Sequence, residues 1–377
     1  MAKLSHTPRF ALLFLSLLLL ILALCAALMR LGWNLGWLQA RVALDHGSLM
    51  VCGFLGTLIC LERAVALGRG WGYAAPVLSA LGSLALAAGA PLAAAKFLTV
   101  LGSAGLVGIF VYVIRKQPAL FTVTMGLGAG AWLAGNVLWF AGAVIPQMFH
   151  WWLAFLVLTI VGERLELNRL LAPSRYVKAL FCLGVGLYLA GLVWTSLRQA
   201  PGEQLAGAGM LALALWLARY DVARFTVRRK GLPRFVALCL FGGYAWLGIG
   251  GLLWMFASRL ENAGGAPLLL YDAVIHSVAL GFVFSMIFAH APIVFPAVTG
   301  RPLAFRRVFY AHVLLLHASL IWRIGGDLTG GFSGYRRGSL MTILAVLMFL
   351  AANVYGLAAG RREAKALAQA QKVPIVS

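Results

Sequence analysis

Histidine has the most specific chemistry in this sequence, because neutral imidazole nitrogen binds iron, copper and zinc. Three of the seven histidines, His46, His150 and His276, each lie near one end of a long apolar run. They are 104 and 126 residues apart along the chain. Each interval has room for about four membrane-spanning helices of typical length. The spacing therefore predicts a repeat in which each unit places one histidine at an equivalent position.

The opposite ends of the same three runs also carry ionisable residues, namely Glu62, Glu163 and His290. A helix rises about 1.5 Å per residue, so each lies roughly 20–24 Å from the histidine of its own run. The three histidines should then share one depth. Because a polar side chain within a span normally faces the bundle interior, we expect a ligand constellation. Buried, hydrogen-bonded histidines without a ligand are the alternative.

Two further features bear on these histidines. Asp272 lies four residues before His276 and so shares its helical face. Its carboxylate is expected to orient the imidazole, unless it is simply an interfacial aspartate. His312 and His317 are five residues apart, so about 140° separates them around a helix and they cannot easily share one metal. We expect His312 to be the ligand of the two, and we assign no role to His290 or His317.

The composition dictates the elements that position these residues. Hydrophobic residues make up 62% of the 377 residues and charged residues only 11%, whereas a soluble domain is about half apolar and about a quarter charged. We therefore expect an all-α integral membrane protein that lies in a lipid bilayer. About twelve apolar runs are long enough to span it. They begin near Phe10, Asp45, Tyr73, Phe97, Leu120, Gln147, Val177, Leu205, Phe235, Leu268, Phe305 and Ser339.

The predicted organisation is a single polytopic domain over residues 1–377. It contains three four-helix units, at about 8–117, 118–231 and 232–362, and a cytoplasmic tail at 363–377. The net charge of +21 does not indicate nucleic-acid binding, because the basic residues flank the apolar runs and form no stripe. With the N-terminus inside, 23 of the 31 basic residues fall on the inner side and 8 on the outer side. The positive-inside rule then places both termini in the cytoplasm of a bacterial-type inner membrane.

Twelve helices in three arcs, with histidines on the second, sixth and tenth, resemble the catalytic subunit of heme-copper oxidases. The segments HGSLMVCGFLGTLICLERA, from residue 46, and HSVALGFVFSMIFAHAPIVFPAVTGR, from residue 276, look like the NnrS family. Those are haem- and copper-containing membrane proteins linked to nitric oxide. The resemblance implies that His46 and His276 clamp a low-spin haem, and that His150 binds copper.

The resemblance also assigns partners to outward-facing arginines. Arg336 and Arg337 occupy the place of an arginine pair that holds haem propionates. Arg323 is a third outward cation, for which either propionates or Asp327 would supply the opposite charge. The haem would be a noncovalent b-type haem, because the sequence has no CxxCH motif.

The sequence also departs from the oxidase pattern. The run that begins near Val177 has no histidine pair, and the tenth run has no His-x-His. Oxygen reduction with proton pumping is therefore not expected, and the sequence does not decide whether the protein is an enzyme. The expected function is haem binding, with copper as an additional metal, in nitric oxide response or respiratory redox chemistry. Nitric oxide or another small diatomic molecule would be the ligand, and the electron donor is not identified.

Two other functions stay open. A twelve-helix secondary transporter usually shows two related halves, whereas the repeat here is in thirds. The second alternative is a sensor or assembly protein that uses the same scaffold without catalysis.

Overall fold

The computed structural model describes residues 7–197, 199–262, 264 and 266–370. Every regular element in these residues is a helix, and they contain no strand. The chain divides into two compact units, Met1–Glu166 and Leu167–Ser377. The single domain and the threefold repeat expected from the sequence stay predictions.

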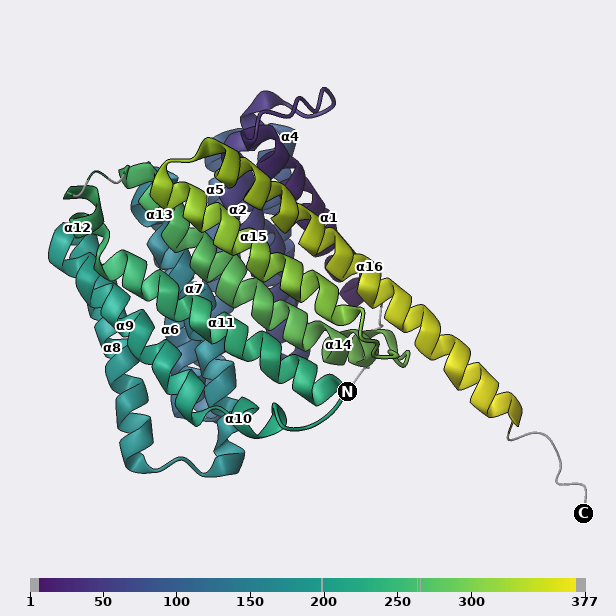
Figure 1. Ribbon diagram of the computed structural model, residues 1–377. Helices are drawn as coiled ribbons and strands as arrows, with labels where there is room; N and C mark the ends of the chain where they lie inside the picture. The colour runs from purple at the N-terminus through teal and green to yellow at the C-terminus, as the bar shows by residue number, and fades with distance from the viewer. Residues whose placement is uncertain (1–6, 198, 263, 265, 371–377) are drawn as a thin grey trace, which may run out of the picture. The chain divides into compact units, whose positions relative to one another are not determined.

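The first unit is the purple-to-blue part of the chain in Figure 1. Its elements are α1 (Thr7–Arg30), η1 (Ala40–Asp45), α2 (His46–Ser48), η2 (Leu49–Gly56), α3 (Thr57–Leu67), η3 (Gly70–Tyr73), α4 (Ala74–Ala88), α5 (Leu92–Lys116), α6 (Leu120–Phe140) and α7 (Ile145–Asn168). Leu19, Ala23, Val42, Leu49 and Ala80 form a fully buried cluster that joins α1, η1, η2 and α4.

Glycines allow helices of this unit to approach closely. A Cβ atom on Gly82 of α4 would lie 2.9 Å from the Ala95 carbonyl oxygen on α5, and one on Gly102 of α5 would lie 2.9 Å from the Ser79 nitrogen on α4. Such spacing leaves no room for a side chain. This is how small residues stabilise helix pairs in membranes, where lipid offers no hydrophobic drive for association.

The second unit is the teal-to-yellow part of the chain in Figure 1. It contains η4 (Arg169–Leu171), α8 (Arg175–Leu197), α9 (Gln199–Tyr220), α10 (Ala223–Thr226), α11 (Leu232–Met255), α12 (Ala257–Asn262), α13 (Pro267–His276), η5 (Ser277–Phe284), α14 (Ser285–Thr299), α15 (Phe309–Thr329) and α16 (Phe332–Ala370). The helix pairs α8–α9 and α15–α16 are both glycine-packed. A Cβ on Gly209 would lie 2.3 Å from the Tyr188 nitrogen, and one on Gly326 would lie 2.4 Å from the Tyr335 nitrogen.

Among the residues that the structure describes, each unit contains one eight-residue π-helix, η2 in the first and η5 in the second. In both units the π-helix interrupts a long apolar helix just after a histidine. His46 is three residues before η2, and His276 directly precedes η5. π-helical turns are rare and occur frequently at functional sites, so these two helices are the first places to search for one.

Among the described residues, ten helices are long and apolar enough to cross a membrane. Ten of the twelve predicted runs correspond to them. The other two predicted runs are helical as well, at α9 and α15, but they are not among the ten. The protein is thus an all-α multi-pass membrane protein, and the count of twelve spans stays a prediction.

The last helix, α16, is 39 residues long, which is about 58 Å at the usual rise. A bilayer core is only about 30 Å thick. The expected tail at 363–377 begins within this helix, which continues to Ala370, and Glu363 forms an ion pair with Arg306. Residues 371–377 lie outside the described part of the chain.

Candidate functional site

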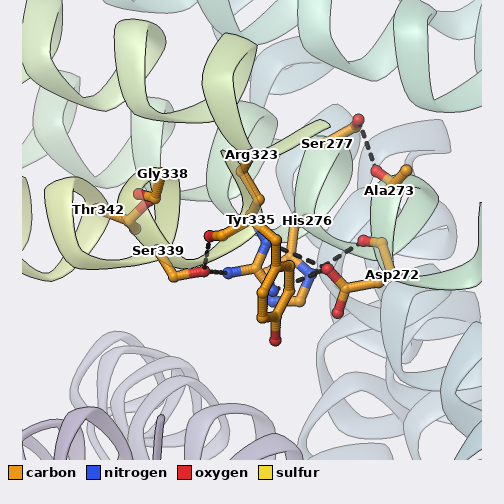
Figure 2. Close-up of polar contacts among 9 residues, drawn as sticks. All are labelled: Asp272, Ala273, His276, Ser277, Arg323, Tyr335, Gly338, Ser339 and Thr342. Carbon is orange, nitrogen blue, oxygen red and sulfur yellow. Dashed lines mark hydrogen bonds and ion pairs between the residues drawn. The ribbon is translucent and has the colours of Figure 1, made fainter. Parts of the chain in front are cut away.

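The second unit contains an ion pair between Asp272 on α13 and Arg323 on α15 (Figure 2). Both nitrogens Nε and Nη2 of Arg323 donate to one oxygen, Oδ2 of Asp272, at 3.1 and 2.8 Å. The side chains are only 8% and 16% exposed. Removing two charges from water is expensive, and good hydrogen-bond geometry is needed to offset that cost. The pair therefore fixes α13 against α15.

Helix α16 completes the surroundings of Arg323. The third guanidinium nitrogen, Nη1, donates to the Ser339 hydroxyl, and that hydroxyl donates to the Tyr335 carbonyl oxygen at 2.8 Å. The Tyr335 ring covers the guanidinium, with its centre 4.7 Å from the central carbon. Gly338 makes this close approach of α16 to α15 possible, because a Cβ there would lie 2.6 Å from the backbone nitrogen of Arg323. All four residues are drawn in Figure 2.

Asp272 also holds His276, one helical turn further along α13. Nδ1 of His276 lies 2.9 Å from the Asp272 carbonyl oxygen and 3.2 Å from its carboxylate Oδ2. Both neighbours are acceptors, so Nδ1 carries the proton and Nε2 carries the lone pair of the neutral ring. The structure thus brings together Asp272, His276 and Arg323, three of the residues that the sequence analysis selected.

A second carboxyl group adjoins this network. Asp327 lies on α15 four residues after Arg323, and so on the same face of that helix. The residue is only 3% exposed. Neither of its carboxyl oxygens receives an N–H or O–H group from the described residues. Arg323 thus pairs with Asp272 in this structure, and the partner that the sequence suggested for it, Asp327, lies beside that pair.

The two remaining arginines do not join the network. Arg336 and Arg337 are exposed on α16, immediately after Tyr335. Their expected pairing with haem propionates stays a prediction.

His312, the fourth predicted ligand, lies elsewhere in the second unit, where it is 1% exposed. Its ring makes edge contacts with phenylalanines, among them Phe288 and Phe349 at centroid distances of 4.7 and 5.6 Å. Neither ring nitrogen has a hydrogen-bond partner among the described residues. His312 is thus separate from the Asp272 network in its contacts.

The other two predicted ligands belong to the first unit. Nδ1 of His46 lies 2.9 Å from the Ala23 carbonyl oxygen on α1. His150 lies in the first turns of α7, with its ring 5.9 Å from that of Trp151. His276 is in the other unit, so the meeting of the three histidines stays a prediction. In the described part of the chain, no three His, Cys, Asp or Glu side chains form a group that could hold a metal ion.

Two histidines without an assigned role have local partners. His290 places Nδ1 2.8 Å from the Met286 carbonyl oxygen. His317 accepts a hydrogen bond from the Trp246 indole at 2.9 Å through Nδ1. In His317, therefore, Nε2 carries the proton, so neither nitrogen of the neutral ring is a free ligand.

Sequence reasoning missed Ser339 and Tyr335, because both act through a contact between α15 and α16. The one available signal was the spacing of Gly334 and Gly338, a Gly-x-x-x-Gly pattern typical of close helix pairs in membranes. It indicates a packed face at this point of the chain, but not the arginine that lies against it.

The chemistry of His276 fits a haem ligand. Metal-bound histidines usually donate their second ring nitrogen to a carboxylate or carbonyl group, which fixes the tautomer and ring orientation. His276 has both kinds of acceptor on Nδ1. Iron would then meet Nε2, a neutral imidazole nitrogen of the type that haem proteins use.

In the described residues, an all-helical chain with ten helices of membrane-spanning length defines a multi-pass membrane protein, here one with a buried ion network. Residues 9–357 match the family described as Domain of unknown function (DUF8744), and the chain belongs to that family. No curated protein and no solved structure matches the chain.

Proposed function

We propose that this protein binds a noncovalent b-type haem in the membrane and acts in nitric oxide response or respiratory redox chemistry. The observation that carries the proposal is the fixed ring of His276. Its Nδ1 is held by the Asp272 carbonyl and carboxylate, so Nε2 is the ring nitrogen that would bind the iron. The resemblance to the NnrS family and the heme-copper oxidases implies that His46 would be the second residue that holds the haem.

The local structure of His46 supports its assignment. Nδ1 of His46 is also held by a carbonyl oxygen, that of Ala23. Each of the two histidines is followed by an eight-residue π-helix. The same rare interruption within three residues after each histidine supports a common functional role for the two positions.

The residues around His276 would tune the bound group. Asp272 accepts a hydrogen bond from Nδ1 of His276, which makes the imidazole a stronger donor to iron, and Arg323 holds the Asp272 carboxylate in place. Arg336 and Arg337 are exposed on α16, directly after the Tyr335 that covers Arg323, and they would pair with the haem propionates. A haem held by both histidines would supply one-electron transfer, and nitric oxide would bind its iron only by displacing one of them. Copper at His150 is the additional metal implied by the resemblance.

The test is an absorption spectrum of the purified full-length protein, recorded with and without haem added during expression. We expect a Soret band whose intensity is proportional to protein. His276→Ala and His46→Ala should each lower the haem content strongly, while circular dichroism shows the helix content unchanged. His317→Gln is the matched control, because His317 is also half-buried in the second unit but has its Nδ1 occupied by Trp246.

Two outcomes would overturn the proposal. One is a preparation that shows no Soret band even after haem supplementation. The other is a full haem content in His276→Ala, which would assign the iron to another residue. Metal analysis of the same sample reports whether copper accompanies the iron.

A further inference from the structure

Positive charge gathers in the second unit where the loop between α14 and α15 meets α16. We call residues 300–308 and 361–365 the basic cluster. Glu363 is the one acid in these two segments, and it forms an ion pair with Arg306. Six basic residues minus one acidic residue give the cluster a net charge of +5. All six cations are exposed: Arg301, Arg306, Arg307, Arg361, Arg362 and Lys365.

Backbone packing fixes the loop of the cluster against the helix. The Ala304 N–H donates to the Gly356 carbonyl oxygen at 2.9 Å. One turn further along α16, a Cβ on Gly360 would lie 3.0 Å from the Ala304 nitrogen and would overlap the Pro302 carbonyl oxygen. In Figure 1, α16 continues past this loop as the yellow end of the chain. The loop arginines are therefore held beside the cations of α16.

The spacing of charges along α16 places the cluster at the level of lipid headgroups. Residues 338–360, between Arg337 and Arg361, include no charged side chain. These 23 residues extend over about 35 Å at the usual rise. The hydrocarbon core of a bilayer is about 30 Å thick, and the headgroups lie directly outside it. Arg361 thus begins the part of α16 that meets the headgroups.

The faces of α16 that carry these cations are apolar on the side towards the core. Val354 and Tyr355 are 69% and 55% exposed. They lie seven residues before Arg361 and Arg362, which is close to two helical turns, so each shares a face with its cation. A phospholipid needs both a cation for its phosphate and an apolar surface for its acyl chains. A soluble acidic protein would use the cations alone, so the combination favours a lipid.

We propose that the basic cluster is a binding site for an anionic phospholipid, whose phosphate accepts hydrogen bonds from the guanidinium groups while its acyl chains lie along α16. Guanidinium groups form paired, charge-assisted hydrogen bonds with phosphate oxygens. Clusters of about 4–8 Lys and Arg residues at the end of a membrane helix are typical of anionic-lipid recognition. Positive charge at helix ends also sets orientation, but orientation does not require cations from two segments to converge. The inference does not depend on haem.

Native mass spectrometry of the full-length protein in detergent tests the site. Phosphatidylglycerol and phosphatidylcholine with the same acyl chains are added separately, and the bound lipid is counted. We expect phosphatidylglycerol to bind much more tightly than phosphatidylcholine, whose choline cancels the charge of the phosphate. The double variant Arg361→Gln with Arg362→Gln should weaken phosphatidylglycerol binding by at least about tenfold, because each cation near an anionic surface contributes about fivefold.

The matched control removes the same charge from another helix end of the same unit. Arg175 and Lys178 are exposed in the first turn of α8, which packs against α9. The double variant Arg175→Gln with Lys178→Gln should change the affinity by less than about threefold, because distant surface charges are screened. Circular dichroism of each variant checks that its helix content is unchanged.

A third variant should act in the opposite direction. Glu363→Gln removes the acid of the cluster and releases Arg306 from its ion pair, so it should tighten phosphatidylglycerol binding by about fivefold. A purely structural role of these residues predicts no such gain, and this variant carries the test if the arginine double variant does not fold.

Three results would overturn the proposal. Equal binding of the two lipids would mean that the cluster does not recognise anionic headgroups, and an acidic protein would then be the better partner. Equal losses in the two double variants would mean that only the total charge matters. Unchanged or weaker binding in Glu363→Gln would place the lipid elsewhere. None of these results depends on the Soret band, so the lipid site and the haem proposal can fail separately.

Discussion

Arg323 donates two hydrogen bonds to a single carboxylate oxygen of Asp272, at 3.1 and 2.8 Å. The two residues are 51 positions apart in the chain, and they fasten helices α13 and α15 together. The same oxygen lies 3.2 Å from Nδ1 of His276. Oδ2 of Asp272 thus contacts both the buried guanidinium and the candidate iron ligand, so loss of this carboxylate would remove a partner from each of them.

Removing the cation should therefore destabilise the fold. Arg323→Met leaves Asp272 buried without its counter-charge, which typically costs about 3–5 kcal/mol in unfolding free energy. Arg306→Met is the matched control, because the Arg306–Glu363 pair is about half exposed, at 47% and 51%. Exposed pairs contribute only about 0–1 kcal/mol. Thermal or denaturant unfolding in detergent measures both.

The double variant Asp272→Leu with Arg323→Met makes the test specific. It removes both charges, so it should recover much of the stability lost in the single variant. If Arg323→Met and Arg306→Met lowered the free energy of unfolding equally, burial would contribute nothing to the stability of the Asp272–Arg323 pair.

The contact between α15 and α16 makes neighbouring glycines respond differently to substitution. A Cβ on Gly326 would lie 2.4 Å from the Tyr335 nitrogen, whereas one on Gly325 meets nothing within 4 Å. We expect Gly326→Ala to separate the two helices and cost about 1–3 kcal/mol, in the range of overpacking. Gly325→Ala should be neutral or raise stability by up to about 1 kcal/mol, because alanine favours helix. The free energies of unfolding of the two variants, measured under the same conditions, test this prediction. Similar values would contradict the close packing of α15 against α16.

The π-helix of the first unit should be similarly intolerant of added volume. A Cβ on Gly56 would lie 2.5 Å from the Trp132 indole, which is fully buried and stacked on Phe155 at 4.7 Å. The indole has no free space to enter, so Gly56→Ala should destabilise the protein by about 1–3 kcal/mol. Gly130, on the same helix as Trp132, has nothing within 4 Å of a Cβ and serves as the control. If Gly56→Ala were as stable as Gly130→Ala, the packing around Trp132 would accommodate the extra methyl group, and the prediction would be wrong.

Apolar runs and helical spacing predicted much of this structure. The twelve runs are all helical, and the four-residue interval between Asp272 and His276 correctly indicated a shared face. Both predictions use local chain geometry, which a sequence states directly. Whether His46 and His276 meet is not a local property, and it stays a prediction.

The rest of the site depends on tertiary contacts. Arg323 meets Asp272 across 51 residues, and Ser339 reaches Arg323 only because Gly338 lets α16 come close. The π-helices were also missed. Hydropathy depends on which residues are apolar, whereas a π-helix is defined by a backbone shift from i→i+4 to i→i+5 bonding.

The uninterrupted course of α16 has a mechanical consequence. Ser339, which binds Arg323, and Glu363, which pairs with Arg306, lie 24 positions apart on this one helix, or about 36 Å. Rigid secondary elements are among the structures that carry coupling between distant sites. A rotation of the helix near Glu363 would therefore be expected to move Ser339 as well. That movement would change the hydrogen bond between the Ser339 hydroxyl and the Arg323 guanidinium.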